Sequence, residues 1–176
     1  MRTITKSLLA AATVATLMAS GAALAGVSVS FVKPEEFTDV PRSQIERERL
    51  QTEFSRYFAS LGKQLPAGQN LKVEVLDIDL AGQLWPRRSG GDDIRIMRGG
   101  ADWPQMRLRY TLEENGQTVR SGDERLSNMN YQMRMGRYSD SDPLRYEKQM
   151  VDDWFGKTIV PKVAASPSAA TPPAAR

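Results

Sequence analysis

Residues 105–126, QMRLRYTLEENGQTVRSGDERL, decide the fold predicted for this chain of 176 residues. Polar and apolar side chains alternate over residues 105–112, which is the period of a half-buried strand. The Asn-Gly pair at 115–116 tolerates the positive φ angles of a tight hairpin turn. A second strand is expected to return over about residues 118–126. The stretch therefore predicts an antiparallel hairpin whose apolar face is formed by Met106, Leu108, Tyr110 and Leu112.

Two more strands are predicted upstream of this hairpin. Residues 27–32, VSVSFV, alternate in the same way. Residues 70–80, NLKVEVLDIDL, are apolar in one phase at first and in the opposite phase afterwards. A change of phase within one strand indicates a β-bulge. Beyond it, Asp77 and Asp79 are expected to share a face opposite Ile78.

An amphipathic helix is predicted between these two strands. Ser43 and Glu46 have the spacing of a capping box, in which each side chain binds a backbone N–H of the other residue. Gly62 and Pro66 then bracket the end of the helix. Large apolar residues recur at helical spacing on one side of it (Leu50, Phe54, Tyr57, Phe58, Leu61 and Leu65).

Residues 142–155, DPLRYEKQMVDDWF, predict a second amphipathic helix. Asp142 is a suitable N-cap and Pro143 a suitable first helical residue. One side of this helix is apolar apart from one acid and one threonine (Leu144, Glu147, Val151, Trp154, Phe155, Thr158 and Ile159). The remaining positions are polar and are expected to face solvent (Arg145, Lys148, Gln149, Asp152 and Asp153). We favour a structural role, with Trp154 and Phe155 packed on the sheet; the alternative is that Arg145, Tyr146 and Asp152 converge on a ligand.

The order of these elements predicts an α/β (α+β) fold. The first strand, helix and strand form a right-handed crossover that gives a parallel pair, and the hairpin extends the sheet antiparallel. Both helices need an apolar partner, and one face of the sheet can cover both. We therefore expect a two-layer sandwich: a mixed sheet of about four strands with two amphipathic helices on one face.

The N-terminal segment has the pattern of a secretory signal peptide. Arg2 and Lys6 precede an uncharged apolar run, and Ala23-Leu24-Ala25 supplies the small residues of a cleavage site. We expect residues 1–25 to be removed, leaving no membrane span and a periplasmic protein. Residues 26–163 are then expected to form a single domain, and the Pro/Ala/Ser-rich residues 164–176 a disordered tail.

Composition excludes several classes of function. The chain has 24 basic and 21 acidic residues, and two of the basic ones fall in the signal segment, so no basic patch favours nucleic-acid binding. It contains no Cys and no His, which excludes Cys–His and Ser–His–Asp catalysis and zinc sites built on those residues. We predict no metal site and no cofactor. The methionines, including Met133 and Met135, are interpreted as packing residues rather than as copper ligands.

Four stretches resemble a bacterial family known as domain of unknown function 3016. They are VSFVKPEEFTDV (29–40), LDIDLAGQLWPRRSGGDDIRIMR (76–98), the pair MRLRYTL (106–112) and DERLSNMNY (123–131), and DPLRYEKQMVDDWF (142–155). The resemblance covers about residues 27–157. It implies export by a Gram-negative bacterium. It implies no catalytic residues, because the family has no assigned activity.

The candidate ligand site lies around residues 81–104, a long stretch in which only residues 94–97 suggest a short strand. Long loops in compact domains are often functional. Arginine side chains there and on the polar face of the neighbouring strand can receive an anion or pair with nearby aspartates. Two tryptophans flank the stretch, either as a ligand platform or, as we favour, as packing against the sheet. The candidate binding residues are Trp85, Arg87, Arg88, Trp103, Arg107 and Arg109.

These observations favour a non-enzymatic binding or cell-envelope accessory protein, whose partner is an envelope protein or an anionic small ligand. One alternative is a hydrolase of envelope glycans, which would need two carboxylates in a cleft, such as Asp77 or Asp79 with Asp92 or Asp93. The other is a structural subunit that recruits a partner by adding a strand to the sheet edge.

Overall fold

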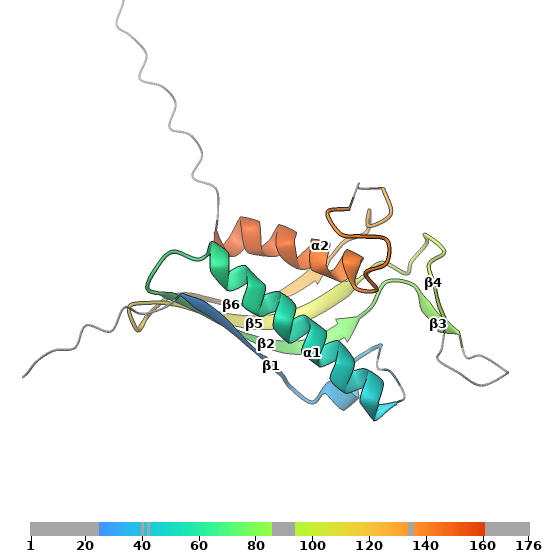
Figure 1. The fold of residues 1–176 in the computed structure, drawn as a ribbon, viewed down its shortest axis with the longest axis horizontal. Coiled ribbons are helices and arrows are strands. Elements are labelled where there is room, and N and C mark those ends of the chain that lie inside the picture. Colours follow the sequence, from blue (N-terminus) through green and yellow to red (C-terminus); the bar gives the residue numbers. More distant parts are fainter. Residues whose placement is uncertain (1–24, 40, 42, 86–93, 134–135, 161–176) are drawn as a thin grey trace, which may run out of the picture.

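The computed structural model describes residues 25–39, 41, 43–85, 94–133 and 136–160, and all structural statements refer to these residues. They form a four-stranded sheet, a separate two-stranded sheet and two α-helices, which together make an α+β fold (Figure 1). In chain order the elements are β1 (Gly26–Phe31), α1 (Gln44–Leu61), β2 (Gln69–Asp79), β3 (Gln83–Trp85), β4 (Ile94–Ile96), β5 (Gln105–Glu114), β6 (Gln117–Ser127) and α2 (Arg145–Trp154).

The large sheet is mixed, as the sequence predicts. Its strand order is β1-β2-β5-β6, in which β1 pairs with β2 in parallel and the other two pairs are antiparallel. Asn115 and Gly116 form the hairpin turn between β5 and β6 with φ angles of 50° and 81°. The four apolar side chains predicted for one face of β5 are all buried, whereas Arg107 and Arg109 on the other face are exposed.

The predicted β-bulge lies in β2. The register of β2 against β5 shifts between Val75 and Asp77, so Leu76 is the extra residue. The bulge lets Val75 before it and Ile78 after it face the same core, with exposed fractions of 0% and 1%. Asp77 and Asp79 consequently lie on the polar face, as expected.

Both helices cover the same face of the sheet and lie side by side over it (Figure 1). Helix α1 contributes four buried side chains to the core, Phe54, Tyr57, Phe58 and Leu61. Trp154 of α2 is 5% exposed, and its indole meets the Tyr110 ring of β5 edge-to-face at a centroid distance of 5.5 Å. The two-layer arrangement is confirmed, and α2 continues into a π-helical turn, Phe155–Ile159.

The predicted helix caps differ in detail. Ser43 precedes α1, but its side chain makes no capping hydrogen bond; its carbonyl accepts from the Arg47 N–H instead. Helix α2 begins at Arg145 rather than at Pro143, because Asp142 Oδ1 accepts from the Leu144 N–H at 2.9 Å and forms a turn before the helix.

Two further expectations need correction. Lys148 and Gln149 were predicted to face solvent but are buried, with exposed fractions of 8% and 5%. Glu53 and Asp142 lie against Lys148, and the stretch before α2 lies beside Gln149. The stretch 81–104 was predicted to be mostly loop, but β3 and β4 pair antiparallel within it. Among the described residues, none of the helices has the length and apolar character needed to cross a bilayer.

Candidate functional site

The polar face of the four-stranded sheet carries a row of charges across three strands. Arg109 on β5 lies between Glu74 on β2, at 3.3 Å, and Asp123 on β6, at 3.2 Å. All three side chains are about half exposed. Exposed pairs of this kind contribute little to stability. Arg109 is therefore occupied by two carboxylates rather than presented to an anion.

Arg107, one position along the same face, has a different environment. Its cross-strand neighbours are Asp77 on β2 and Arg125 on β6. Asp77 is already bound by Thr38, whose N–H and hydroxyl donate to its two oxygens at 2.7 and 2.9 Å. Within the described residues Arg107 has no hydrogen bond or ion pair. Its side chain is exposed.

The other predicted site residues are not gathered with these arginines. Trp85 lies on β3 in the separate small sheet, is 45% exposed, and has the Arg98 guanidinium 4.9 Å from its ring centre. This exposure corrects the expectation that Trp85 packs against the large sheet. Trp103 is half-buried just before β5. Arg87 and Arg88 lie outside the described residues, so the six-residue site stays a prediction.

A partly buried polar network fixes the β3–β4 hairpin to the rest of the fold. The Arg95 guanidinium on β4 donates to Asp39 at 2.8 Å and to the Ala81 carbonyl at 3.0 Å. The Ala81 N–H in turn donates to the Glu147 carboxylate of α2 at 2.7 Å. Both backbone groups of Ala81 are thus held by side chains, which positions the hairpin relative to α2.

Glu147 is almost completely buried, with an exposed fraction of 1%. Its burial raises the pKa of the carboxyl group above the usual value, although the Ala81 N–H and the Arg95 charge act in the opposite direction. Its second oxygen has no hydrogen-bond partner among the described residues. Burial, together with the charges of Asp39 and Asp77, also raises the pKa of Asp79.

An apolar groove of about 550 Å³ lies beside this network. Its apolar residues come from α1, from the residues just before α1 and α2, and from the residues just after β2 and β4. The charged residues Glu46, Arg49, Glu53 and Arg95 also line it. Pockets of this volume with an apolar lining are typical of ligand sites. The apolar lining consists of Pro41, Leu50, Leu80, Met97, Pro143 and Leu144.

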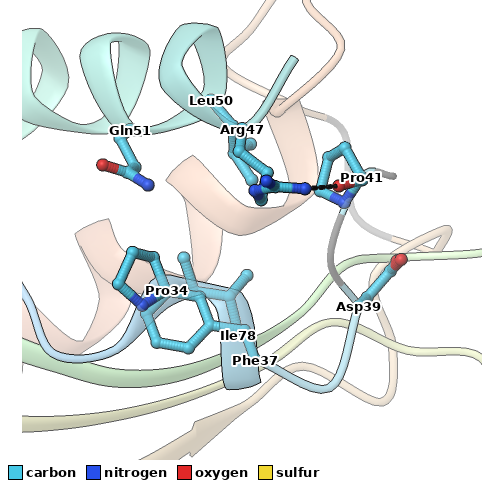
Figure 2. A pocket seen from close by; sticks show the side chains of 8 residues that line it. All are labelled: Pro34, Phe37, Asp39, Pro41, Arg47, Leu50, Gln51 and Ile78. Carbon is cyan, nitrogen blue, oxygen red and sulfur yellow. Dashed lines mark hydrogen bonds between the residues drawn. The ribbon is translucent and has the colours of Figure 1, made fainter. Parts of the chain in front are cut away.

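A neighbouring cavity is too small for a ligand. Figure 2 shows it between the start of α1 and the 3₁₀ turn that follows β1, with Phe37 and Ile78 on one side and Leu50 on the other. Its volume is about 10 Å³, room for a single water molecule at most. Arg47 closes one end by donating to the Pro41 carbonyl at 2.9 Å. This cavity is a packing junction.

A second large cavity, of about 440 Å³, lies on the other side of α2. Arg145 and Tyr146 line it, in accord with the alternative hypothesis for this helix. Asp152 does not line it, because its oxygens accept from the hydroxyls of Tyr57 at 2.6 Å and Tyr138 at 2.7 Å. Burial and the Asp152 carboxylate raise the pKa of Tyr138 to about 12.

Sequence reasoning missed Gln132, Asp140 and Gln149, which also line this second cavity. Gln149 was assigned to the exposed side of its helix, and the other two lie in a stretch without regular patterning. The sequence offered one signal for Gln149, which is that this polar residue lies one position away from the apolar side of the helix. It was not specific enough to distinguish a cavity wall from a solvated surface.

The catalytic and metal hypotheses gain no support from the described residues. Asp79 accepts from the Gln105 side chain at 3.3 Å, and its proposed partners Asp92 and Asp93 lie outside the described residues. The glycan hydrolase and the strand-adding subunit stay predictions; β1 and β6 are the edge strands open to the latter. In the part of the chain that is described, no group of three or more Asp or Glu side chains is placed to hold a metal ion.

Comparison with known proteins places this fold in a family. The model for the family described as "Protein of unknown function (DUF3016)" matches residues 25–157, which include all the described strands and both α-helices. The chain therefore belongs to the DUF3016 family, as the four sequence stretches suggested. Neither the curated proteins nor the solved structures contain a match to it.

Proposed function

We propose that this chain is an exported, non-enzymatic binding module of the cell envelope. The observation that supports binding most directly is the apolar groove of about 550 Å³ between α1, α2 and β4. Its export is supported by the basic, apolar and small-residue segments of residues 1–25.

The groove suits an apolar protein segment flanked by charges. Leu80 and Leu144 at its base are 5% exposed each, so the base is continuous with the core. Among the described residues, Glu46 and Arg49 on α1 have no ion-pair partner, which leaves one charge of each sign at the rim. Complementary charges at a rim set the register of a partner, while apolar burial supplies the affinity.

The network around Ala81 keeps the groove preformed. Arg95 lines the groove while bound to Asp39 and Ala81, and Glu147 holds the other side of Ala81. A preformed site loses less conformational entropy on binding than a mobile one. This stiffness supports a binding role over a purely structural one.

Dye binding tests the groove in the mature protein. A naphthalene sulfonate dye that fluoresces in apolar sites should bind wild type, and Met97→Asp should abolish the signal, because a carboxylate in the lining is costly to desolvate. Met133→Asp is the matched control, since Met133 is 87% exposed and lies outside the groove. Equal fluorescence from both variants would contradict the groove as a binding site.

Export has its own test. Residues 1–25 fused to a reporter enzyme that is active only outside the cytoplasm should give activity, and an Arg replacing Val14 in the apolar run should abolish it. A fusion that stays inactive while the full-length protein is recovered from the cytoplasm would contradict the periplasmic assignment.

A further inference from the structure

The cavity on the far side of α2 has the construction of a separate binding site. It measures about 440 Å³, within the range of small-molecule pockets, and shares no lining residue with the apolar groove. Its lining is polar and aromatic, drawn from the first turns of α2 and from the stretch before it. The side chains that matter are those of Gln132, Tyr138, Asp140, Arg145, Tyr146 and Gln149.

Gln149 is the observation that points to a ligand. Its exposed fraction is 5%, and within the described residues its amide makes no hydrogen bond to the protein. The amide atoms are not among the buried side-chain atoms that lack a partner, so they open onto the cavity. A primary amide carries two donors and an acceptor, which a molecule in the cavity can satisfy. Its helix neighbours Glu147 and Lys148 are bonded to protein groups. Gln149 instead lines the cavity, where a ligand can satisfy the amide.

The aromatic wall of the cavity is held rigidly. The Tyr146 ring meets the buried Tyr131 ring edge-to-face at 4.7 Å, and the Arg145 guanidinium lies 4.5 Å from its centre. Tyr131 is fixed in turn by its hydroxyl, which donates to Asp102 at 2.9 Å. A preorganised ring offers a flat apolar surface at little entropic cost.

The charges around the cavity are balanced rather than of one sign. Arg145 donates only to uncharged oxygens, those of the Asp140 carbonyl at 2.9 Å and the Tyr146 hydroxyl at 3.2 Å, with a longer bond to the Asp142 carbonyl. The Asp140 side chain lines the cavity and has no hydrogen bond within the described residues. One cation and one anion beside two amides disfavour a phosphate, which would be repelled by Asp140.

We infer that this cavity binds a carbohydrate, with Gln149, Asp140 and Arg145 directed at hydroxyl groups and Tyr146 against a sugar face. Each sugar hydroxyl is both a donor and an acceptor, and adjacent hydroxyls match the paired atoms of planar amide, carboxylate and guanidinium groups. The C–H face of a pyranose ring is apolar and suits an aromatic side chain. The site goes beyond the proposed groove and uses different residues.

Calorimetric titration of the mature protein tests the inference. The probe is the tetrasaccharide of N-acetylglucosamine, whose acetamido groups match the glutamine amides, with maltotetraose and inorganic phosphate titrated in parallel. Wild type should bind at least one of the two sugars in a 1:1 ratio and should not bind phosphate. Gln149→Leu should weaken binding about tenfold, as the loss of one well-placed hydrogen bond predicts.

Controls separate a binding role from a structural one. Gln149→Leu should leave the melting temperature nearly unchanged, because the amide makes no hydrogen bond to the described protein groups that the substitution could break. Gln117→Leu, at an exposed position on β6, should leave sugar affinity unchanged. If Gln149→Leu fails to fold, Asp140→Ala, at an exposed residue, supplies the binding test.

Three outcomes overturn the inference: wild type binds neither sugar, phosphate binds in their place, or both cavity variants bind sugar as wild type does. Met97→Asp should retain sugar binding, so a failure of the apolar groove and a failure of the carbohydrate site are distinguishable.

Discussion

The two sides of α2 treat buried polar groups in opposite ways. On the side toward α1 and β2, Lys148 Nζ lies 2.7 Å from both Glu53 and Asp142, and Glu147 accepts from the Ala81 N–H. On the other side, Gln149 is just as buried and has no partner among the described residues. The comparison teaches that burial alone does not mark a structural residue; what distinguishes the candidate site is a largely buried side chain whose polar group faces a cavity and makes no hydrogen bond to the protein.

The partnered side joins distant parts of the chain. Burial by itself would lower the pKa of Lys148, but its hydrogen bonds to Asp142 and Glu53 outweigh burial and raise the pKa above the usual value. The Tyr57 hydroxyl shares its one proton between the Lys148 carbonyl and Asp152, each at 2.6 Å. Charged residues that sequence patterning assigned to a solvated surface thus fix α1 to α2.

The largest expected effect comes from the residue that anchors α2 between these two sides. Trp154→Ala should lower the free energy of unfolding by about 3–5 kcal/mol, because it removes a buried indole and leaves a cavity against Tyr110. Urea unfolding measures this loss of unfolding free energy. Trp85→Ala, at a 45% exposed tryptophan, should cost less than about 1 kcal/mol. Similar losses for the two variants would show that Trp154 is not the anchor.

The second prediction concerns the pH dependence of the partnered side. Because the folded-state pKa of Glu147 is raised, the folded protein binds this proton more tightly than the unfolded chain does. The stability that Glu147 contributes through this raised pKa is therefore fully present at a pH below the unfolded pKa of 4.5. It is lost as pH rises from there through the folded pKa. Each tenfold difference in proton affinity corresponds to about 1.4 kcal/mol.

The amide introduced by Glu147→Gln cannot ionise, so the variant should not lose this stability as pH rises. The difference in unfolding free energy between variant and wild type should shift in favour of the variant as pH rises from about 4 to 8. Comparison with wild type cancels the parallel contribution of Asp79, whose pKa is also raised. A difference that is constant across this range would show that Glu147 is not perturbed in the folded state.

The smallest expected effect is on the cavity side. Tyr146→Phe keeps the ring against Tyr131 and removes only the hydroxyl that accepts from Arg145 at 3.2 Å. The cost should be less than about 1 kcal/mol in urea unfolding, because the bond is partly exposed. A loss as large as that of Trp154→Ala would mean that the cavity side is as structural as the core.

Much of the fold follows from local patterns. The alternation around Leu108, the Asn-Gly turn at 115–116 and the phase change in β2 each encode geometry within a few residues, and all three are confirmed. The burial of Trp154 follows from helical spacing. The hairpin β3–β4 was harder to predict because each strand has three residues, too few to establish a period.

The sites depend on contacts between distant segments, which local patterns do not specify. Lys148 is buried because Glu53, 95 residues earlier, and Asp142 lie against it. Gln149 faces a cavity because the stretch around Tyr138 passes beside α2. Helical periodicity identifies the side of α2 that meets the sheet, but it cannot show what covers the flanks.

Thermal melting of two adjacent substitutions tests the contrast between the sides of α2 most directly. Lys148→Met should lower the unfolding free energy by about 1–3 kcal/mol, because it leaves Asp142 and Glu53 without their shared cation. Gln149→Leu should leave it nearly unchanged. If both substitutions destabilise the protein equally, or if Gln149→Leu is the worse of the two, the amide that faces the cavity has a structural role and the contrast is wrong.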